Sequence, residues 1–278
     1  MDAIPEIPLA ARYTGVGDAP PDWDSISRDI LCPLCDYNLR GLSEPRCPEC
    51  GYRFAWPHLL FPERWQHPFL FEHQPRRNTW SFVRTFSTSF FPRKFWSVLN
   101  ASHPPRPSRL FLYWIGASVL VAIAVVLLVV ELFLRARSTW AIDRYVLTLI
   151  STCAICLAWP FLTFATLMIF RASMRRAKVR SIHVARCVVY GCNAAVWIGL
   201  LLTAFSLLLG EIDGFADFMT RTAIFCIAMA AVNLYHLGCA YRQYLKFDHP
   251  WAAVAATQII VGLIFCVLAV NVTTLLLR

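Results

Sequence analysis

Four cysteines near the N-terminus have the spacing of metal ligands. Cys32 and Cys35 form one Cys-x-x-Cys pair, and Cys47 and Cys50 form a second pair after eleven intervening residues. Two such pairs supply four thiolates, the ligand set that a tetrahedral structural zinc site prefers. Gly51 follows the last cysteine and lets the backbone turn tightly around a metal ion. The spacing therefore predicts a small zinc ribbon built of short β-hairpins.

The same ligands leave other chemistry open. A rubredoxin-like iron centre also uses four thiolates, and ligand geometry alone does not separate iron from zinc. Two disulfides, or a chance spacing, are the remaining alternatives, but we place this segment in the reducing cytoplasm, where disulfides are rare. We therefore predict one structural Zn²⁺ ion as the cofactor, with iron as its alternative. Because four thiolates fill every coordination position, the centre predicts no catalysis.

The charge around these cysteines argues against nucleic-acid binding. Between residues 28 and 53, four arginines are balanced by four acidic residues. A zinc tetrathiolate would add negative charge to this segment. Phosphate groups would find no basic surface there, so we expect no nucleic-acid partner.

Composition places the rest of the chain in a membrane. Hydrophobic residues make up 58% of the 278 residues and charged residues 15%, with a mean hydropathy of +0.52. A soluble protein of this size cannot bury so much apolar surface. A membrane-spanning helix needs about 20 mostly apolar residues. The stretches that meet this requirement are Leu110–Leu134, Tyr145–Phe170, Cys187–Leu209, Thr222–Tyr241 and Trp251–Leu277. We predict an all-α polytopic membrane helix bundle with about five spans.

Basic residues give the predicted orientation. Most Lys and Arg residues flank the span ends that would be cytoplasmic if the N-terminus lies inside. Such an excess marks the cytoplasmic side of a membrane protein. We therefore predict a multi-pass protein of the cytoplasmic membrane, with the N-terminus in the cytoplasm and the C-terminus outside.

These patterns divide the chain into four segments. Residues 1–27 are expected to form a flexible polar leader and residues 28–55 the zinc ribbon. Residues 56–109 form a basic, aromatic linker with an interfacial amphipathic helix, and residues 110–278 form the five-span transmembrane domain.

The linker helix is expected to begin with Asn78 as its N-cap and to end before Pro92. Its apolar face carries four residues at helical spacing, namely Phe82, Val83, Phe86 and Phe90. This face either lies in the membrane surface, with basic residues toward the lipid headgroups, or packs on the helix bundle. Amphipathicity alone does not choose between the two.

Four polar side chains share one depth in the cytoplasmic half of the third to fifth spans. They are Asn193, Asn233, His236 and Gln258. Such groups can hold helices together by hydrogen bonds. They can also line a small polar pocket around His236.

The cysteine pairs also resemble a known arrangement. The sequences Cys-Pro-Leu-Cys and Cys-Pro-Glu-Cys-Gly, with Tyr-Asn-Leu-Arg-Gly-Leu between them, are similar to the zinc-ribbon heads of many bacterial membrane proteins. The following region resembles the Yip (Ypt/Rab-interacting protein) five-span membrane family. The resemblance lies in Phe91–Trp96 before the first span and in the Arg-x-x-x-Tyr pattern of Arg186 and Tyr190. It implies membrane-embedded scaffolding or partner recruitment, without enzymatic activity and without catalytic residues.

Two functions agree with these features. The first is a non-enzymatic membrane scaffold or adaptor, whose partners are the lipid bilayer and a cytosolic protein bound at the zinc ribbon. The alternative is a transporter or channel for a small solute that uses the polar residues of the third to fifth spans. We disfavour an intramembrane hydrolase, because the chain contains neither Gly-x-Ser-x-Gly nor His-Glu-x-x-His.

Overall fold

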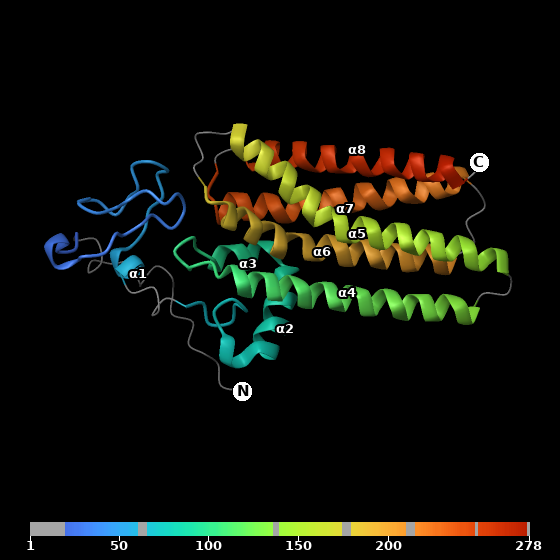
Figure 1. Cartoon of the computed structure of the whole chain (residues 1–278), viewed down its shortest axis with the longest axis horizontal. Coiled ribbons are helices and arrows are strands. Elements are labelled where there is room, and N and C mark those ends of the chain that lie inside the picture. Colours follow the sequence, from blue (N-terminus) through green and yellow to red (C-terminus); the bar gives the residue numbers. More distant parts are fainter. Residues whose placement is uncertain are drawn as a thin grey trace.

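The chain forms a bundle of long helices with a small cysteine-rich head at one end (Figure 1). The structure is a computed structural model that describes residues 20–60, 66–135, 139–173, 179–209, 215–247 and 250–276. Most of the predicted polar leader, residues 1–19, lies outside the described residues. The head consists of residues 20–60 and contains the short helix α1 (Trp56–Leu60).

Five long helices build the bundle. They are α4 (Pro107–Arg135), α5 (Thr139–Ser173), α6 (Ser181–Leu209), α7 (Phe215–Gln243) and α8 (Pro250–Leu276). Proline is the first residue of α4 and of α8, where its missing N–H costs no helical hydrogen bond. Helices α5, α6, α7 and α8 pack as a ring, each mainly against two neighbours, and α4 lies against α5 and α6. The head is at the end of the bundle where α4, α6 and α8 begin, which we call the head end.

Four of these helices are long and apolar enough to cross a membrane. Their candidate spans are Pro107–Glu131, Ser181–Phe205, Ala223–Gln243 and Pro250–Leu268. Large apolar side chains stand exposed on the outer faces of these helices, and only lipid can cover so much of them. The prediction of an all-helical membrane bundle is therefore confirmed.

The second predicted span, 145–170, differs from the other four. It lies within the continuous helix α5, but the apolar stretch formed by described side chains, Cys153–Ile169, is shorter than a full crossing. Most side chains on either side of that stretch lie outside the described residues. The described residues show four candidate spans, and the fifth stays a prediction.

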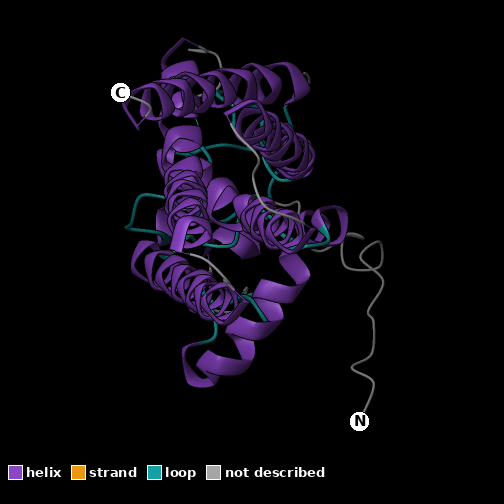
Figure 2. Ribbon diagram, turned by 90° about the vertical axis from the view of Figure 1, so that its right-hand side faces the viewer, coloured by secondary structure: helices purple, strands orange, loops and turns teal. Residues whose placement is uncertain are grey.

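Two short helices, α2 (Asn78–Ser89) and α3 (Pro92–Val98), connect the head to α4. Helix α2 packs on α6, and α3 packs on α7. Figure 2 looks along the bundle and shows α2 from its side below the other helices, so α2 runs across the bundle axis. Asn78 is the first helical residue and not the predicted N-cap, because its side-chain oxygen instead accepts a hydrogen bond from Arg109 Nη2 at 2.6 Å.

The buried face of α2 also differs from the predicted apolar face. The fully buried residues are the small Ser81, Thr85 and Ser89, whereas Val83 is 58% exposed. Small side chains let α2 approach the bundle closely, and its aromatic rings then pack at the sides of this contact. The predicted face is thus divided between the bundle and the surroundings.

Around the cysteines, the described residues contain no β-strand. Two isolated antiparallel bridges, Leu31 with Asn38 and Arg46 with Arg53, flank the cysteine pairs. The predicted β-hairpins are therefore reduced to single bridges, because each turn is closed by hydrogen bonds that do not extend into a ladder.

The contact between α7 and α8 gives a stability prediction. A Cβ atom added at Gly238 would lie 2.1 Å from Trp251 Cζ3, so the Trp251 ring must move. We expect Gly238→Ala to lower the free energy of unfolding by about 1–3 kcal/mol, the usual cost of overpacking. Thermal unfolding of the purified protein in detergent measures this.

Gly262 in α8 provides a matched control, because nothing lies within 4 Å of a Cβ added there. Gly262→Ala should be neutral or stabilise the protein by up to about 1 kcal/mol through helix propensity. Equal losses in the two variants would contradict the predicted contact.

Candidate metal centre

The two cysteine pairs fold into the same tight turn. In each pair, the N–H of the first cysteine donates to the carbonyl five residues later, Tyr37 or Tyr52, at 2.8 and 2.9 Å. The residue after the second cysteine has a positive φ in both turns, +62° at Asp36 and +71° at Gly51. Glycine adopts this backbone freely, and aspartate is among the few residues that tolerate it. The sequence therefore builds two matching loops for one ion.

The four sulfur atoms lie together. The Sγ atoms of Cys32, Cys35, Cys47 and Cys50 are all within 4.8 Å of one another. Cys32 and Cys50 are 3.7 Å apart and Cys35 and Cys47 3.6 Å apart, so none of these thiols forms a disulfide. Metal–sulfur bonds of ~2.3 Å in a tetrahedron separate the sulfur atoms by about 3.8 Å. The structure thus brings the four predicted ligands together in a cluster that could hold a metal ion, and its geometry suits zinc and iron alike.

The donor chemistry also suits a bound cation. Burial raises the pKa of the Cys35 thiol to about 12. A metal ion offsets this cost, because it binds the thiolate and releases the proton. With four thiolates, Cys32, Cys35, Cys47 and Cys50 would fill a tetrahedral ion completely and leave no position for a substrate.

The first cysteine pair is docked on the start of α6. The Pro33 carbonyl lies 2.6 Å from His183 Nε2, and the Leu34 carbonyl accepts the Arg180 N–H at 2.9 Å. Arg180 also forms an ion pair with Asp36 at 3.1 Å, with both side chains about half exposed. Backbone carbonyls between the two cysteines are thus bonded to the bundle instead of water. These contacts attach the head to the membrane domain directly beside its metal ligands.

The second pair is attached through Tyr52, which lies directly after Gly51. Its hydroxyl is 2.9 Å from Ser102 Oγ and accepts the Ser102 N–H at 3.2 Å, in a buried position. Ser102 belongs to the linker between α3 and α4. Both halves of the metal centre therefore contact segments that are distant in the sequence.

A fully buried ion pair lies one turn beyond His183 on α6. Arg186 and Glu72 are both 0% exposed and paired at two points, Nε to Oε1 at 2.8 Å and Nη2 to Oε2 at 2.9 Å. The Tyr190 hydroxyl donates to Oε1 and the Arg106 backbone N–H to Oε2, each at 2.9 Å. Each carboxylate oxygen thus has two donors, the arrangement that a buried charge requires.

Arg186 also binds groups beyond Glu72. Its Nη1 donates to the His103 carbonyl at 3.0 Å and to the Tyr244 hydroxyl at 2.9 Å. The same hydroxyl lies 2.6 Å from His183 Nδ1, and the other ring nitrogen of His183 contacts the Pro33 carbonyl. A continuous hydrogen-bond network therefore joins the first cysteine pair, the linker, α6 and the end of α7.

Glu72 is ionised in this network. Burial acts to raise its pKa, but the charge of Arg186 and the hydrogen bonds to the carboxylate lower the pKa below its ordinary value. The pair is therefore charged at neutral pH.

Three histidines surround the ion pair. The ring centroid of His103 is 5.4 Å from that of His67 and 5.9 Å from that of His73. Burial lowers the pKa of His67 to about 3 and the pKa values of His73 and His103 to about 4, and the positive charge of Arg186 adds to each shift. All three rings are thus neutral at pH 7 and leave Arg186 as the cation that neutralises Glu72.

The four predicted intramembrane residues are buried, but hydrogen bonds do not join them into one cluster. Asn193 Nδ2 donates to the Tyr113 hydroxyl at 2.7 Å and lies 3.5 Å from Ser89 Oγ. Gln258 Oε1 accepts from Trp159 Nε1 at 3.1 Å. These two residues therefore hold neighbouring helices together.

The other predicted residues lack such bonds. Among the described residues, both amide atoms of Asn233, Nδ1 of His236 and Nε2 of Gln258 have no hydrogen-bond partner. Buried polar atoms of this kind are rare in native structures, and each calls for an explanation. The predicted polar pocket therefore stays a hypothesis for Asn233, His236 and Gln258. Asn193 differs, because its amide already donates to the Tyr113 hydroxyl.

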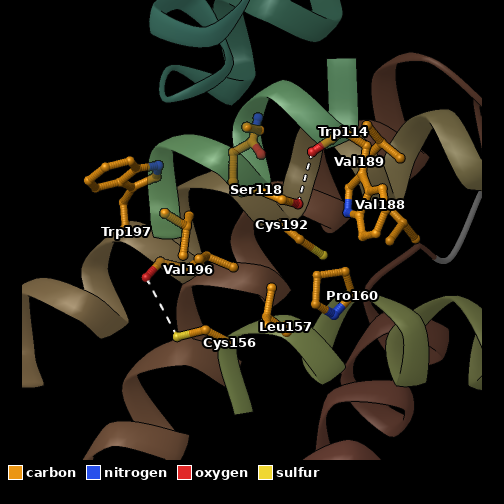
Figure 3. A pocket seen from close by; sticks show the side chains of 13 residues that line it. Trp114, Ser118, Cys156, Leu157, Pro160, Val188, Val189, Cys192, Val196 and Trp197 are labelled. Atoms are coloured by element: carbon orange, nitrogen blue, oxygen red, sulfur yellow. Dashed lines mark hydrogen bonds between the residues drawn. The ribbon is translucent and has the colours of Figure 1, made fainter. Parts of the chain in front are cut away.

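A separate cavity between α4, α5 and α6 is too small for a solute. It holds about 30 Å³ and is lined mainly by apolar side chains, including Trp114, Leu157, Pro160 and Trp197 (Figure 3). Asn193 also lines this cavity, and the Ser118 hydroxyl donates to the Trp114 carbonyl. This volume has room for one or two water molecules.

Neither the ion pair nor the contact of His183 with the Pro33 carbonyl was predicted from the sequence. One signal was available, because Glu72 is the only acidic residue between positions 65 and 109. A single acid in a basic, aromatic segment is a candidate for a buried partner. Nothing in the sequence indicated which arginine it would meet.

The ion pair gives a stability prediction. Arg186→Met leaves the Glu72 carboxylate buried without its cation, so we expect a loss of about 3–5 kcal/mol in the free energy of unfolding. The double variant Glu72→Gln, Arg186→Met should recover part of this loss, because no buried charge then remains. Arg180→Met, which breaks only the half-exposed pair with Asp36, should cost less than about 1 kcal/mol. Thermal unfolding in detergent ranks the three, and equal losses would contradict the assignment.

His67 gives a prediction on pH. Its pKa is about 3 when folded and about 6.5 when unfolded, so the unfolded state binds more protons between these values. Stability therefore falls as the pH drops through this window, by about 2 kcal/mol between pH 7 and pH 5 from this residue alone. We expect His67→Phe to reduce the loss, since His67 Nδ1 has no hydrogen-bond partner to forfeit. Thermal unfolding at several pH values measures this, and an unchanged pH dependence in the variant would refute it.

Comparison with protein-family models, with curated proteins and with solved structures found no match to this chain. The function is therefore inferred from the contacts, distances and burial of the metal centre and the ion pair.

Proposed function

We propose that this protein is a non-enzymatic membrane scaffold that presents a zinc-loaded ribbon to a cytosolic protein partner. The observation that supports this most directly is the attachment of the first cysteine pair to α6 through Pro33 and His183. A head held in this way keeps one position relative to the membrane. Such a fixed position suits an adaptor that must recruit a partner to the bilayer.

The second cysteine pair offers the surface for this partner. Glu44, Arg46, Pro48 and Glu49 are exposed there, and a hollow of about 350 Å³ runs from Leu42 to Gly51. Exposed charges of both signs around a small hollow suit a polar segment of a protein better than a nucleic acid. In this proposal the partner binds at the second cysteine pair, and the first pair stays docked on α6.

Several finer features belong to the same proposal. Zinc is the proposed ion, with iron as the alternative, and the two cysteine loops are a minimal zinc ribbon. The basic flanks of the spans support a cytoplasmic head and an outside C-terminus. The fifth span and the resemblance to the Yip family stay predictions.

The absence of an open coordination position supports a non-enzymatic role. Four thiolates around one ion leave no site for a water or a substrate. The buried Glu72 is bonded on both oxygens, so its carboxylate is occupied as well. Neither group is free to transfer a proton or to polarise a substrate.

Metal analysis tests the proposal. We expect about one zinc ion per chain in the purified full-length protein, and its loss when Cys47 and Cys50 are changed to serine. A photo-crosslinking residue at Ser43 should then capture a cytosolic protein only in the metal-loaded form. The same group at exposed Thr79 on α2 serves as the control position. A metal-free wild type, or crosslinks that persist without metal, would overturn the proposal.

A second candidate function is binding of a small solute within the bundle. The favouring observation is that Asn233, His236 and Gln258 carry unpartnered polar atoms among the described residues. In a membrane interior such atoms are costly unless water or a ligand binds them. A transporter or channel would use them in this way.

Two matched variants separate structural from solute-binding roles. Asn193→Leu removes the hydrogen bond to the buried Tyr113 hydroxyl, so we expect a loss of about 1 kcal/mol in stability. Asn233→Leu removes an unpartnered amide and should leave stability unchanged or raise it by about 1 kcal/mol. Thermal unfolding compares them. A clear loss of stability in Asn233→Leu would show that bound water or solute holds this amide.

A further inference from the structure

The side of α2 that faces away from the bundle exposes large apolar side chains. Trp80 is 44% exposed and Val83 58%, and Phe91 in the turn before α3 is 65% exposed. Phe111, in the first turns of α4, is also exposed. Large apolar side chains gathered at one site mark a surface that another phase or molecule covers.

The same surface is strongly basic. Arg76, Arg77 and Lys94 are exposed, and among the described residues none of them forms an ion pair. The only acidic residue between positions 66 and 109 is Glu72, which is buried and neutralised by Arg186. Within positions 66–109, no exposed acidic residue compensates this basic charge.

Arg84 brings a further charge onto the apolar part. Its guanidinium lies 5.0 Å from the Phe69 ring centroid and 5.2 Å from that of Trp80. Stacked in this way, the cation stays beside aromatic rings and still offers its N–H groups outward. A guanidinium group can donate two parallel hydrogen bonds to the oxygens of one phosphate group.

The position of α2 along the spans identifies what covers this surface. Asn78 is bonded to Arg109 at the start of α4, and the Phe82 ring packs against Gly116. At 1.5 Å per residue, Gly116 lies about 10 Å along the helix from Arg109. Helix α2 runs across the bundle axis at this level (Figures 1 and 2), where α4 passes from its basic end into its apolar part.

We propose that the outer side of α2 is an anionic-phospholipid surface. Trp80, Val83 and Phe91 enter the boundary between headgroups and acyl chains, while Arg76, Arg77 and Lys94 bind the phosphate groups of acidic lipids. The occupant is the bilayer rather than a soluble protein, because α2 lies against the first turns of the apolar helix α4, at Arg109 and Gly116, and the exposed charge beside its apolar side chains is basic.

Photolabelling in liposomes tests this surface. The full-length protein is reconstituted with phosphatidylglycerol or phosphatidylcholine that carries the same photoactivatable acyl chain, and labelled residues are located by mass spectrometry. We expect Trp80, Val83 or Phe91 to be labelled by the anionic lipid at least about 25-fold more than by the neutral one, because each nearby cation adds roughly fivefold.

Neutralising variants provide the matched comparison. Arg76→Gln, Arg77→Gln and Lys94→Gln together should lower this preference to about fivefold, the contribution of the remaining Arg84. Their side chains are exposed, so thermal unfolding should stay at the wild-type value. Arg40→Gln, Arg46→Gln and Arg53→Gln remove the same charge from the head and should leave the preference intact.

Two results would overturn the proposal. The first is equal labelling of α2 by both lipids in the wild type. The second is labelling of α4 without any labelling of α2, which would show that another protein chain covers this surface.

Discussion

At the head end of the bundle, Arg186 and Glu72 are shut off from water and can stay ionised only together. Removing either partner leaves a bare charge in an apolar environment, which costs several kcal/mol. The residues that complete the network come from the linker, from the start of α4 and from the end of α7. One ion pair therefore fixes the relative positions of three helices and the linker.

The ion pair also fixes the position of the metal centre, through Tyr244 and His183. His183 lies one helical turn before Arg186 and shares the Tyr244 hydroxyl with it, so the carbonyl of Pro33 meets a ring that is already oriented. Zinc or iron would hold the two cysteine loops together, but the bundle decides where they stand. This division of roles agrees with the proposed adaptor function. A metal ion would shape the surface of the head, and the bundle sets the position of that surface.

Local patterns in the sequence were sufficient for four candidate spans and for the clustering of the four cysteines. An apolar run is enough to predict a membrane helix, and two Cys-x-x-Cys pairs are enough to predict a shared ion. The ion pair could not be predicted, because Glu72 and Arg186 are 114 residues apart and no local pattern links one to the other. The orientation of α2 was also missed, since small Ser81 and Thr85 allow closer packing than its phenylalanines. Hydropathy identifies apolar side chains, but it does not show which face of a helix packs closely on its neighbours.

The distance in sequence between Pro33 and His183 has a consequence for biosynthesis. These contact residues are 150 positions apart, and at about 5–20 residues per second the ribosome needs roughly ten seconds to make the second after the first. During that interval α4 and α5 emerge before the start of α6. Until α6 is made, the carbonyls of Pro33 and Leu34 have no partner on α6, and the carboxylate of Glu72 has no Arg186 to pair with. Final assembly of the head belongs to the moment when α6 is inserted.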